Sequence, residues 1–128
     1  MAATPDEHVG LVEEAVRAVK PQLRGWLHAG TFPVALVAGV VLVALSGGVR
    51  ETGANTVYVI ASALLFSTSA LYHRGTWSPR VERQLKRMDH SNIFLIIAGT
   101  YTPFSVLLLG DRGGETLLWI VWGAALGG

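Results

Sequence analysis

Three long stretches without a single Asp, Glu, Lys or Arg constrain this sequence more than any other feature. They cover residues 25–49, 52–73 and 90–110, and apolar side chains dominate each of them. An α-helix rises about 1.5 Å per residue, so about 20 residues cross a ~30 Å hydrocarbon core. A composition of 51% hydrophobic and only 15% charged residues also differs from that of a soluble domain. The sequence therefore predicts three transmembrane helices.

A fourth apolar run, TLLWIVWGAALGG, occupies residues 116–128. As a helix it would rise only about 20 Å, which is too short to cross the membrane. We expect a fourth helix that is cut short; a short re-entrant or half-buried segment is the alternative. The predicted fold is all-α, a polytopic transmembrane bundle with helices at about 26–49, 54–73, 90–110 and 116–128.

The distribution of Lys and Arg predicts the orientation in the membrane. The N-terminal segment and the second loop together carry eight of these residues, whereas the first and third loops carry two. Positively charged loops stay on the cytoplasmic side. We therefore expect a multi-pass protein of the cell membrane with a cytoplasmic N-terminus. The eight residues are Arg17, Lys20, Arg24, Arg74, Arg80, Arg83, Lys86 and Arg87, and the two are Arg50 and Arg112.

The N-terminal segment, residues 1–22, has the pattern of an amphipathic helix on the cytoplasmic side. The residues TPDE at 4–7 form a capping box with proline at the first helical position. Pro21 is expected to end this helix. The helix would lie on the inner leaflet or under the bundle, or else form a solvated tail. Its apolar residues at helical spacing are Val9, Val12, Val16 and Val19.

Polar residues at membrane depth are costly, and they gather at two helix ends. If the second and third helices are antiparallel neighbours, these ends meet at one membrane level near the cytoplasmic face. A polar pocket is then expected there. The second helix ends with Ser67, Thr68, Ser69, Tyr72 and His73, and the third begins with Asp89, His90, Ser91 and Asn92.

Three of these residues form a chemically coherent set. Ser69 and His73 are four residues apart and share a helix face. Singly, each has an ordinary explanation: Ser69 could bond to its own helix backbone, His73 could be an interfacial residue, and Asp89 could cap the third helix. Together, an imidazole can bind zinc, a carboxylate can hold a metal-bound water, and a hydroxyl can stabilise an oxyanion.

The sequence contains no cysteine, which excludes disulfides and thiolate metal sites. Any metal would need histidine, carboxylate and water. Pro103 interrupts the third apolar run and predicts a kink, with Thr100 or Thr102 expected to bond to the freed carbonyl.

Three segments resemble successive motifs of one family. KPQLRGWLHAG at 20–30, SALYH at 69–73 and RMDHSNIFLIIAGTYTP at 87–103 are similar to motifs of the hemolysin III family, which belongs with the progestin and adipoQ receptors. The resemblance covers most of the chain from Lys20 onward. It implies seven transmembrane helices with a cytoplasmic N-terminus, of which this chain would hold the N-terminal portion.

The resemblance also implies a zinc site near the cytoplasmic leaflet. By its motifs His73 is a zinc ligand, Asp89 holds the metal-bound water and acts as candidate base, and Ser69 hydrogen-bonds in the same pocket. The family's two other ligands are histidines on the last helix, and nothing here matches them. His28, within WLHAG, is assigned no metal role.

The functional hypothesis that follows is a zinc-dependent hydrolase of a lipid amide or ester. The alternatives are a membrane-perturbing, cytolytic protein and a non-catalytic regulator of membrane state. Expected partners are membrane lipids, including a lipid substrate, and no nucleic acid. Zinc-dependent lipid turnover would distinguish the first hypothesis, and dye release from liposomes the second.

Overall fold

The computed structural model describes residues 5–128, without the side chain of Lys20. Helices account for nearly all of this part of the chain, which confirms the all-α class. A short π-helical segment, η1, joins the third and fourth helices. The bounds are α1 Pro5–Ala44, α2 Val49–Arg74, α3 Pro79–Phe104, η1 Ser105–Leu109 and α4 Gly114–Gly127.

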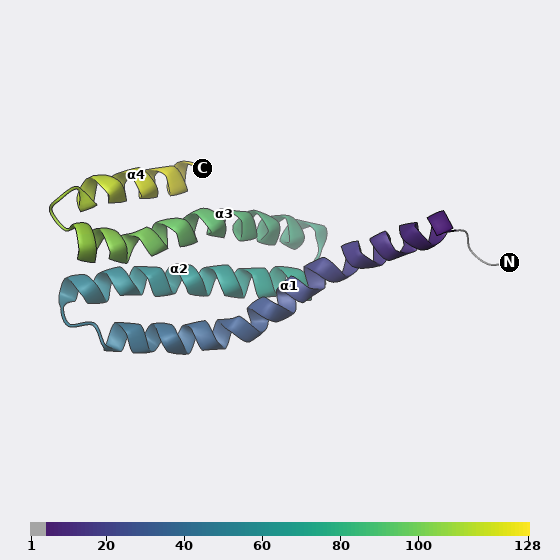
Figure 1. The fold of residues 1–128 in the computed structure, drawn as a ribbon, viewed down its shortest axis with the longest axis horizontal. Helices are drawn as coiled ribbons and strands as arrows, with labels where there is room; N and C mark the ends of the chain where they lie inside the picture. Colours follow the sequence, from purple (N-terminus) through teal and green to yellow (C-terminus); the bar gives the residue numbers. More distant parts are fainter. Residues whose placement is uncertain (1–4) are drawn as a thin grey trace.

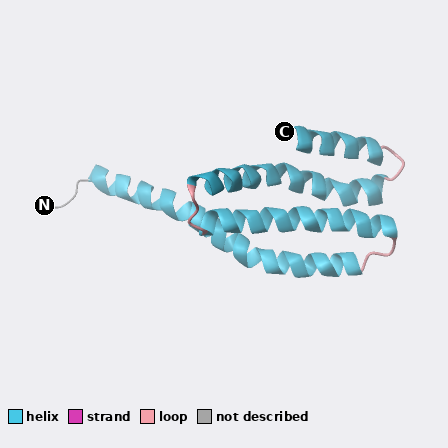
Figure 2. Cartoon of the chain, turned by 180° about the vertical axis from the view of Figure 1, so that it is seen from behind, coloured by secondary structure: helices cyan, strands magenta, loops and turns pink. Residues whose placement is uncertain are grey.

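The four helices lie side by side in chain order, each antiparallel to the one before (Figures 1 and 2). α1 packs on α2, α2 on α3, and α3 on α4. The turn between α2 and α3 lies at the end of the bundle from which α1 extends (Figure 1). The end of α2 and the first half of α3 therefore come together, as the sequence suggested.

Among the described residues, three helices are long and apolar enough to cross a membrane by length and composition, namely α1, α2 and α3 continued through η1. This confirms the three predicted transmembrane helices. The observed helices are longer than the charge-free stretches, however. α3 begins at Pro79 rather than near residue 90, because Ser78 precedes it in an extended conformation and proline suits the first helical turn. Its first turns thus carry four of the five basic residues assigned to the second loop, and the fifth, Arg74, ends α2.

The prediction that Pro21 ends the N-terminal helix is wrong, because α1 runs without a break from Pro5 to Ala44. Pro21 removes one backbone hydrogen bond, but it lies in an exposed part of the helix where water can bond to the freed carbonyl. Figure 1 shows this part of α1 extending well beyond the other helices. Thr4, the expected N-cap, lies outside the described residues.

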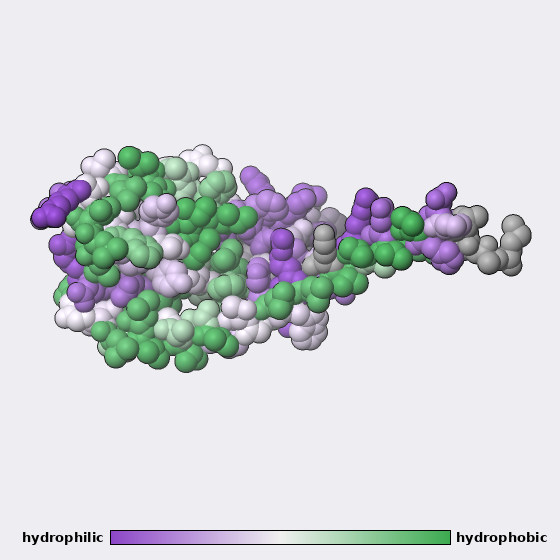
Figure 3. All heavy atoms as spheres, viewed as in Figure 1, coloured by the Kyte–Doolittle hydropathy of each residue, from purple (hydrophilic) through white to green (hydrophobic). Residues whose placement is uncertain are grey.

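The extended part of α1 is amphipathic. Hydrophobic and hydrophilic surfaces follow opposite sides of it in Figure 3. The four valines of the expected apolar face, Val9, Val12, Val16 and Val19, are all exposed. Contact of this face with a membrane surface stays a prediction.

Pro103 lies one residue before the end of α3, and the helix widens into η1 directly after it. π-helical turns are rare and occur mostly as single bulges within helices. The prediction that Thr100 or Thr102 bonds to the carbonyl freed by Pro103 is wrong. The hydroxyl of Thr100 donates to the Ile96 carbonyl at 2.7 Å and that of Thr102 to the Ala98 carbonyl at 2.8 Å, so neither bonds to the Gly99 carbonyl that proline frees.

Glycines set the distances between neighbouring helices. A Cβ placed on Gly39 of α1 would lie 2.7 Å from Val59 Cγ1 of α2, and one on Gly99 of α3 would lie 2.6 Å from Ala61 Cβ. Both distances are shorter than ordinary carbon contacts. Because little hydrophobic force acts between helices in lipid, such close backbone approach is a main source of their association.

Candidate functional site

His73 and Asp89 face each other across the α2–α3 interface. His73 lies in the last turn of α2, and Asp89 lies in α3. The His73 Nε2 and Asp89 Oδ2 atoms are 3.6 Å apart, and each side chain is 12% exposed. This separation is too long for a hydrogen bond. His73 Nε2 is buried and has no hydrogen-bond partner among the described residues.

Ser69 lies one turn before His73 on the same face of α2. It is 1% exposed, and its hydroxyl oxygen also lacks a partner within the described part of the chain. The common bond from serine back to its own helix is therefore not made. A buried hydroxyl without a partner costs roughly 1–3 kcal/mol, unless a water or ligand bonds to it.

Asn92 forms a hydrogen bond from α3 to α2 near His73 and Asp89. Its side-chain amide donates to the Leu64 carbonyl at 3.0 Å, and the residue is 4% exposed. Asn92 follows Asp89 by three residues, so the two share a helix face. This bond fixes the register that places Asp89 opposite His73.

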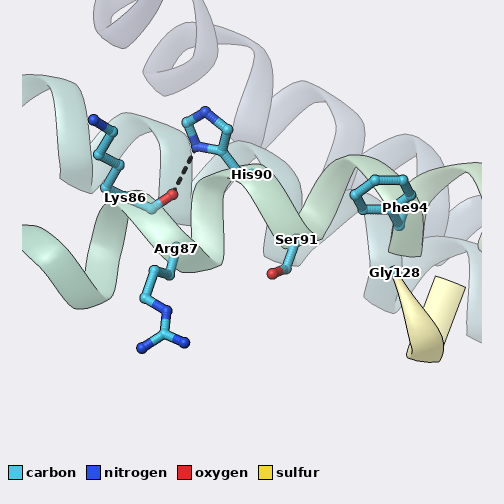
Figure 4. Close-up of a pocket in the computed structure, with 6 residues that line it drawn as sticks. All are labelled: Lys86, Arg87, His90, Ser91, Phe94 and Gly128. Carbon is cyan, nitrogen blue, oxygen red and sulfur yellow. Dashed lines mark hydrogen bonds between the residues drawn. The ribbon is translucent and has the colours of Figure 1, made fainter.

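Other polar residues of the two predicted clusters lie elsewhere. Ser67 is half-buried, and its hydroxyl donates to the Leu64 carbonyl at 3.4 Å. His90 is exposed, and its Nδ1 lies 2.8 Å from the Lys86 carbonyl of its own helix (Figure 4). His90 lines an open pocket that contains neither His73 nor Asp89. The pocket residues are Lys86, Arg87, His90, Ser91, Phe94 and Gly128.

Asp89 does not cap a helix. α3 begins ten residues earlier, at Pro79 after Ser78. This removes the structural alternative that the sequence left open for Asp89, because a carboxylate in mid-helix has no free backbone N–H groups to accept from. A half-buried aspartate within a membrane helix therefore needs another partner, and His73 is the nearest one identified.

α1 contributes to the surroundings of His73 in a way that the sequence did not predict. A Cβ on Gly25 would lie 2.9 Å from His73 Cβ, and the Arg74 guanidinium stacks 4.1 Å above the Trp26 ring. His28 follows one turn later. Its Nδ1 is buried without a hydrogen-bond partner among the described residues, and the residue interacts electrostatically with Asp89 and His73.

The sequence alone does not place His28 near His73, because it gives no register between α1 and α2. The one available signal was a histidine within an otherwise apolar and charge-free run, WLHAGTFPVALVAGV. Such residues are expensive in a membrane and usually have a partner.

The donor chemistry of His73, Asp89 and Ser69 fits a zinc site, but the number of donors falls short. Catalytic zinc takes three protein ligands and a water. Within residues 5–128, no three His, Asp or Glu side chains lie close enough together to hold a metal ion. The described residues thus offer one imidazole nitrogen and a neighbouring carboxylate, which is part of such a site.

Three membrane-length helices with a buried polar group near one end define a polytopic helical membrane protein. The chain belongs to the haemolysin-III related family, whose sequence model matches residues 16–128. It is 40% identical over 94 residues to Hemolysin-3 of Bacillus cereus and 39% identical over 94 residues to the Hemolysin-3 homolog of Bacillus subtilis (strain 168).

Each of these matches covers 73% of this chain, but only 42% of the first relative and 44% of the second. The chain therefore spans less than half the length of the curated relatives it matches. No solved structure matches it significantly.

Proposed function

We propose that this protein contributes part of the active site of a zinc-dependent membrane hydrolase that cleaves an amide or ester bond in a lipid. The observation that carries the proposal is the approach of His73 Nε2 and Asp89 Oδ2 to 3.6 Å, beside the buried and unpartnered Ser69 hydroxyl. Perturbed or unpartnered polar groups at membrane depth are functional candidates by default.

Each residue has a distinct role in this proposal. His73 holds the metal through an imidazole nitrogen, and Asp89 accepts a proton from the attacking water. The Ser69 hydroxyl donates a hydrogen bond to the substrate carbonyl oxygen as negative charge develops there. Zinc, when bound, would supply Lewis acidity for the carbonyl and a lowered pKa for its water. The family resemblance implies two further histidine ligands, and no residue of this sequence matches them.

The site would lie near the cytoplasmic leaflet of the cell membrane, with the N-terminus cytoplasmic. The Lys and Arg bias of eight to two supports this orientation. A lipid substrate could then place its carbonyl at the level of His73 while its acyl chains stay in the hydrocarbon. Membrane lipids would thus be both the solvent and the substrate of the protein.

The test is turnover of lipid amides and esters by the full-length natural protein in liposomes, with and without a zinc chelator. Asp89→Asn should lower kcat by about 100-fold or more, the scale of general acid–base catalysis. His73→Ala should abolish zinc-dependent turnover, while Ser67→Ala, outside the site, should leave it unchanged. Turnover that survives both the chelator and His73→Ala would refute the proposal.

The name of the two relatives, Hemolysin-3, makes membrane lysis the competing hypothesis. The same liposomes loaded with a dye distinguish the two. Dye release without lipid turnover would favour a lytic function.

A further inference from the structure

We propose that His28 is a third polar side chain of the His73–Asp89 site, where it positions the group bound between them, and that Gly25 is the residue that brings it there. This inference rests on the proposed function for the nature of the bound group. It concerns α1, to which the family motifs assigned no role in the site.

The His28 ring is held in place by an aromatic contact. Its centroid lies 5.4 Å from that of Phe66, with the ring planes at 78°, an edge-to-face arrangement. Phe66, Ser69 and His73 follow one another at spacings of three and four residues, so all three lie on one face of α2. His28 therefore packs on the face of α2 that carries Ser69 and His73.

The polar edge of His28 is left available by this packing. Its Nδ1 is buried and unpartnered among the described residues, as are Ser69 Oγ and His73 Nε2. Ser69 Oγ and His73 Nε2 lie on one face of α2, and His28 Nδ1 belongs to α1, which packs on that face. With the Asp89 carboxylate opposite His73, these atoms match in number the two to four partners that a buried water or a ligand oxygen requires.

His28 also lies within electrostatic range of the other members of the site. It interacts with Asp89 and His73, and with Arg24 one turn earlier on α1. Because His28, His73 and Asp89 do not form a group that could hold a metal ion themselves, we assign His28 a positioning role. It would hydrogen-bond to the Asp89 carboxylate or to the bound oxygen, as residues that hydrogen-bond to metal ligands commonly do.

Gly25 accounts for the close approach of α1. A Cβ at this position would lie 2.9 Å from His73 Cβ, 2.9 Å from Arg74 Cγ and 3.2 Å from the His73 carbonyl carbon. The last contact involves backbone, which cannot rotate away. Any larger residue must push α1 from α2 at His73, and His28, one turn away, would move with it. Gly30 provides the contrast, because a Cβ there would meet nothing within 4 Å.

Two substitutions of His28 separate a polar role from a packing role. His28→Phe keeps the aromatic contact with Phe66 and removes both ring nitrogens, whereas His28→Asn keeps a polar atom close to the Nδ1 position and loses the ring. His90→Phe is the matched control, because His90 is exposed and bonds to its own helix (Figure 4).

The measurement is zinc affinity of the full-length natural protein in detergent, by competition with a chromophoric chelator. His28→Phe should weaken zinc binding 10-fold or more, within the range seen for second partners of metal ligands. His28→Asn should stay within about 3-fold of the natural protein, and His90→Phe should match it. Gly25→Ala should weaken binding as His28→Phe does, and Gly30→Ala should not. The opposite order of the two His28 variants, or no effect of either, would overturn the proposal.

A second readout needs no metal. The ¹⁵N imidazole signals of His73 should shift in His28→Phe and Gly25→Ala, and stay near their natural positions in His28→Asn, His90→Phe and Gly30→Ala. If the natural protein binds no zinc, the hydrolase proposal fails. The His73 signals then test only whether His28 belongs to the site, and unchanged signals in His28→Phe would refute that role.

Discussion

Single atoms decide how closely these helices approach one another. Gly99 of α3 lies against Ala61 of α2, where an added Cβ would come within 2.6 Å of the Ala61 methyl. Gly53 of α2 is the opposite case, since nothing lies within 4 Å of its added Cβ. The two glycines therefore allow the cost of close approach to be separated from the intrinsic helix propensity of alanine.

We expect Gly99→Ala to destabilise the protein by about 1–3 kcal/mol, the usual cost of overpacking a tight contact. Gly53→Ala should be neutral or stabilise it by up to about 1 kcal/mol, because alanine is the better helix former. Unfolding of both variants in mixed detergent micelles measures the difference. Equal stability of the two variants would show that α2 and α3 do not touch at Gly99.

The residues of the site were predictable from sequence to different degrees. Ser69 and His73 share a face by spacing alone, and Asp89 joins them once two adjacent helices pair in an antiparallel manner. His28 was not predictable, because its place depends on the register between α1 and α2. That register follows from the contacts of Gly25 with His73 and of Gly39 with Val59, which no local pattern in the sequence specifies.

At the scale of helices, the packing of α2 against α3 brings Ser69, His73 and Asp89 together. Cysteines at positions 69 and 92 should form a cross-link within one chain, because both residues are buried in this interface and Asn92 bonds to Leu64 across it. Cysteines at Leu71 and Ile93, which are both exposed, should cross-link far less. Electrophoresis after oxidation and proteolysis between the two helices distinguishes the outcomes. If no cross-link forms at 69 and 92, or at neighbouring positions on the same faces, the two polar clusters do not meet.

The extent of the helices was less predictable than their number. Charge-free stretches mark the part of each helix that suits hydrocarbon, but a helix continues wherever its backbone hydrogen bonds can form. α3 therefore includes Arg80, Arg83 and Arg87, and α1 continues through Pro21. Proline is a reliable sign of a lost hydrogen bond, and only an uncertain sign of a helix end, because an exposed carbonyl can bond to water instead.

For the whole molecule, the Lys and Arg bias predicts which side each loop occupies. A reporter fused at residue 78, in the turn between α2 and α3, should behave as cytoplasmic, and one fused at residue 52 as external. Paired alkaline phosphatase and fluorescent protein fusions measure this. The reverse pattern would move the His73–Asp89 pair to the other leaflet.

The 128-residue chain is expected to hold no stoichiometric zinc. His73 supplies one firm nitrogen, and one ligand is too few for tight binding in a tetrahedral site. Atomic spectroscopy after dialysis in detergent measures the metal content. A chain that also carries the two further histidines of the family should bind zinc; His73→Ala should remove it, and Asp89→Ala should affect turnover more than binding. One tightly bound zinc in the 128-residue chain would contradict this prediction.

The arrangement of the helices in chain order also has a consequence for biogenesis. Since α2 packs on α1, α3 on α2 and α4 on α3, each helix that leaves the ribosome meets a partner that is already in the membrane. The glycines and polar groups of each helix therefore make their contacts with the helix synthesised just before it. Such sequential contacts keep loop-closure costs low. The His73–Asp89 pair can therefore form during synthesis, as soon as α3 inserts.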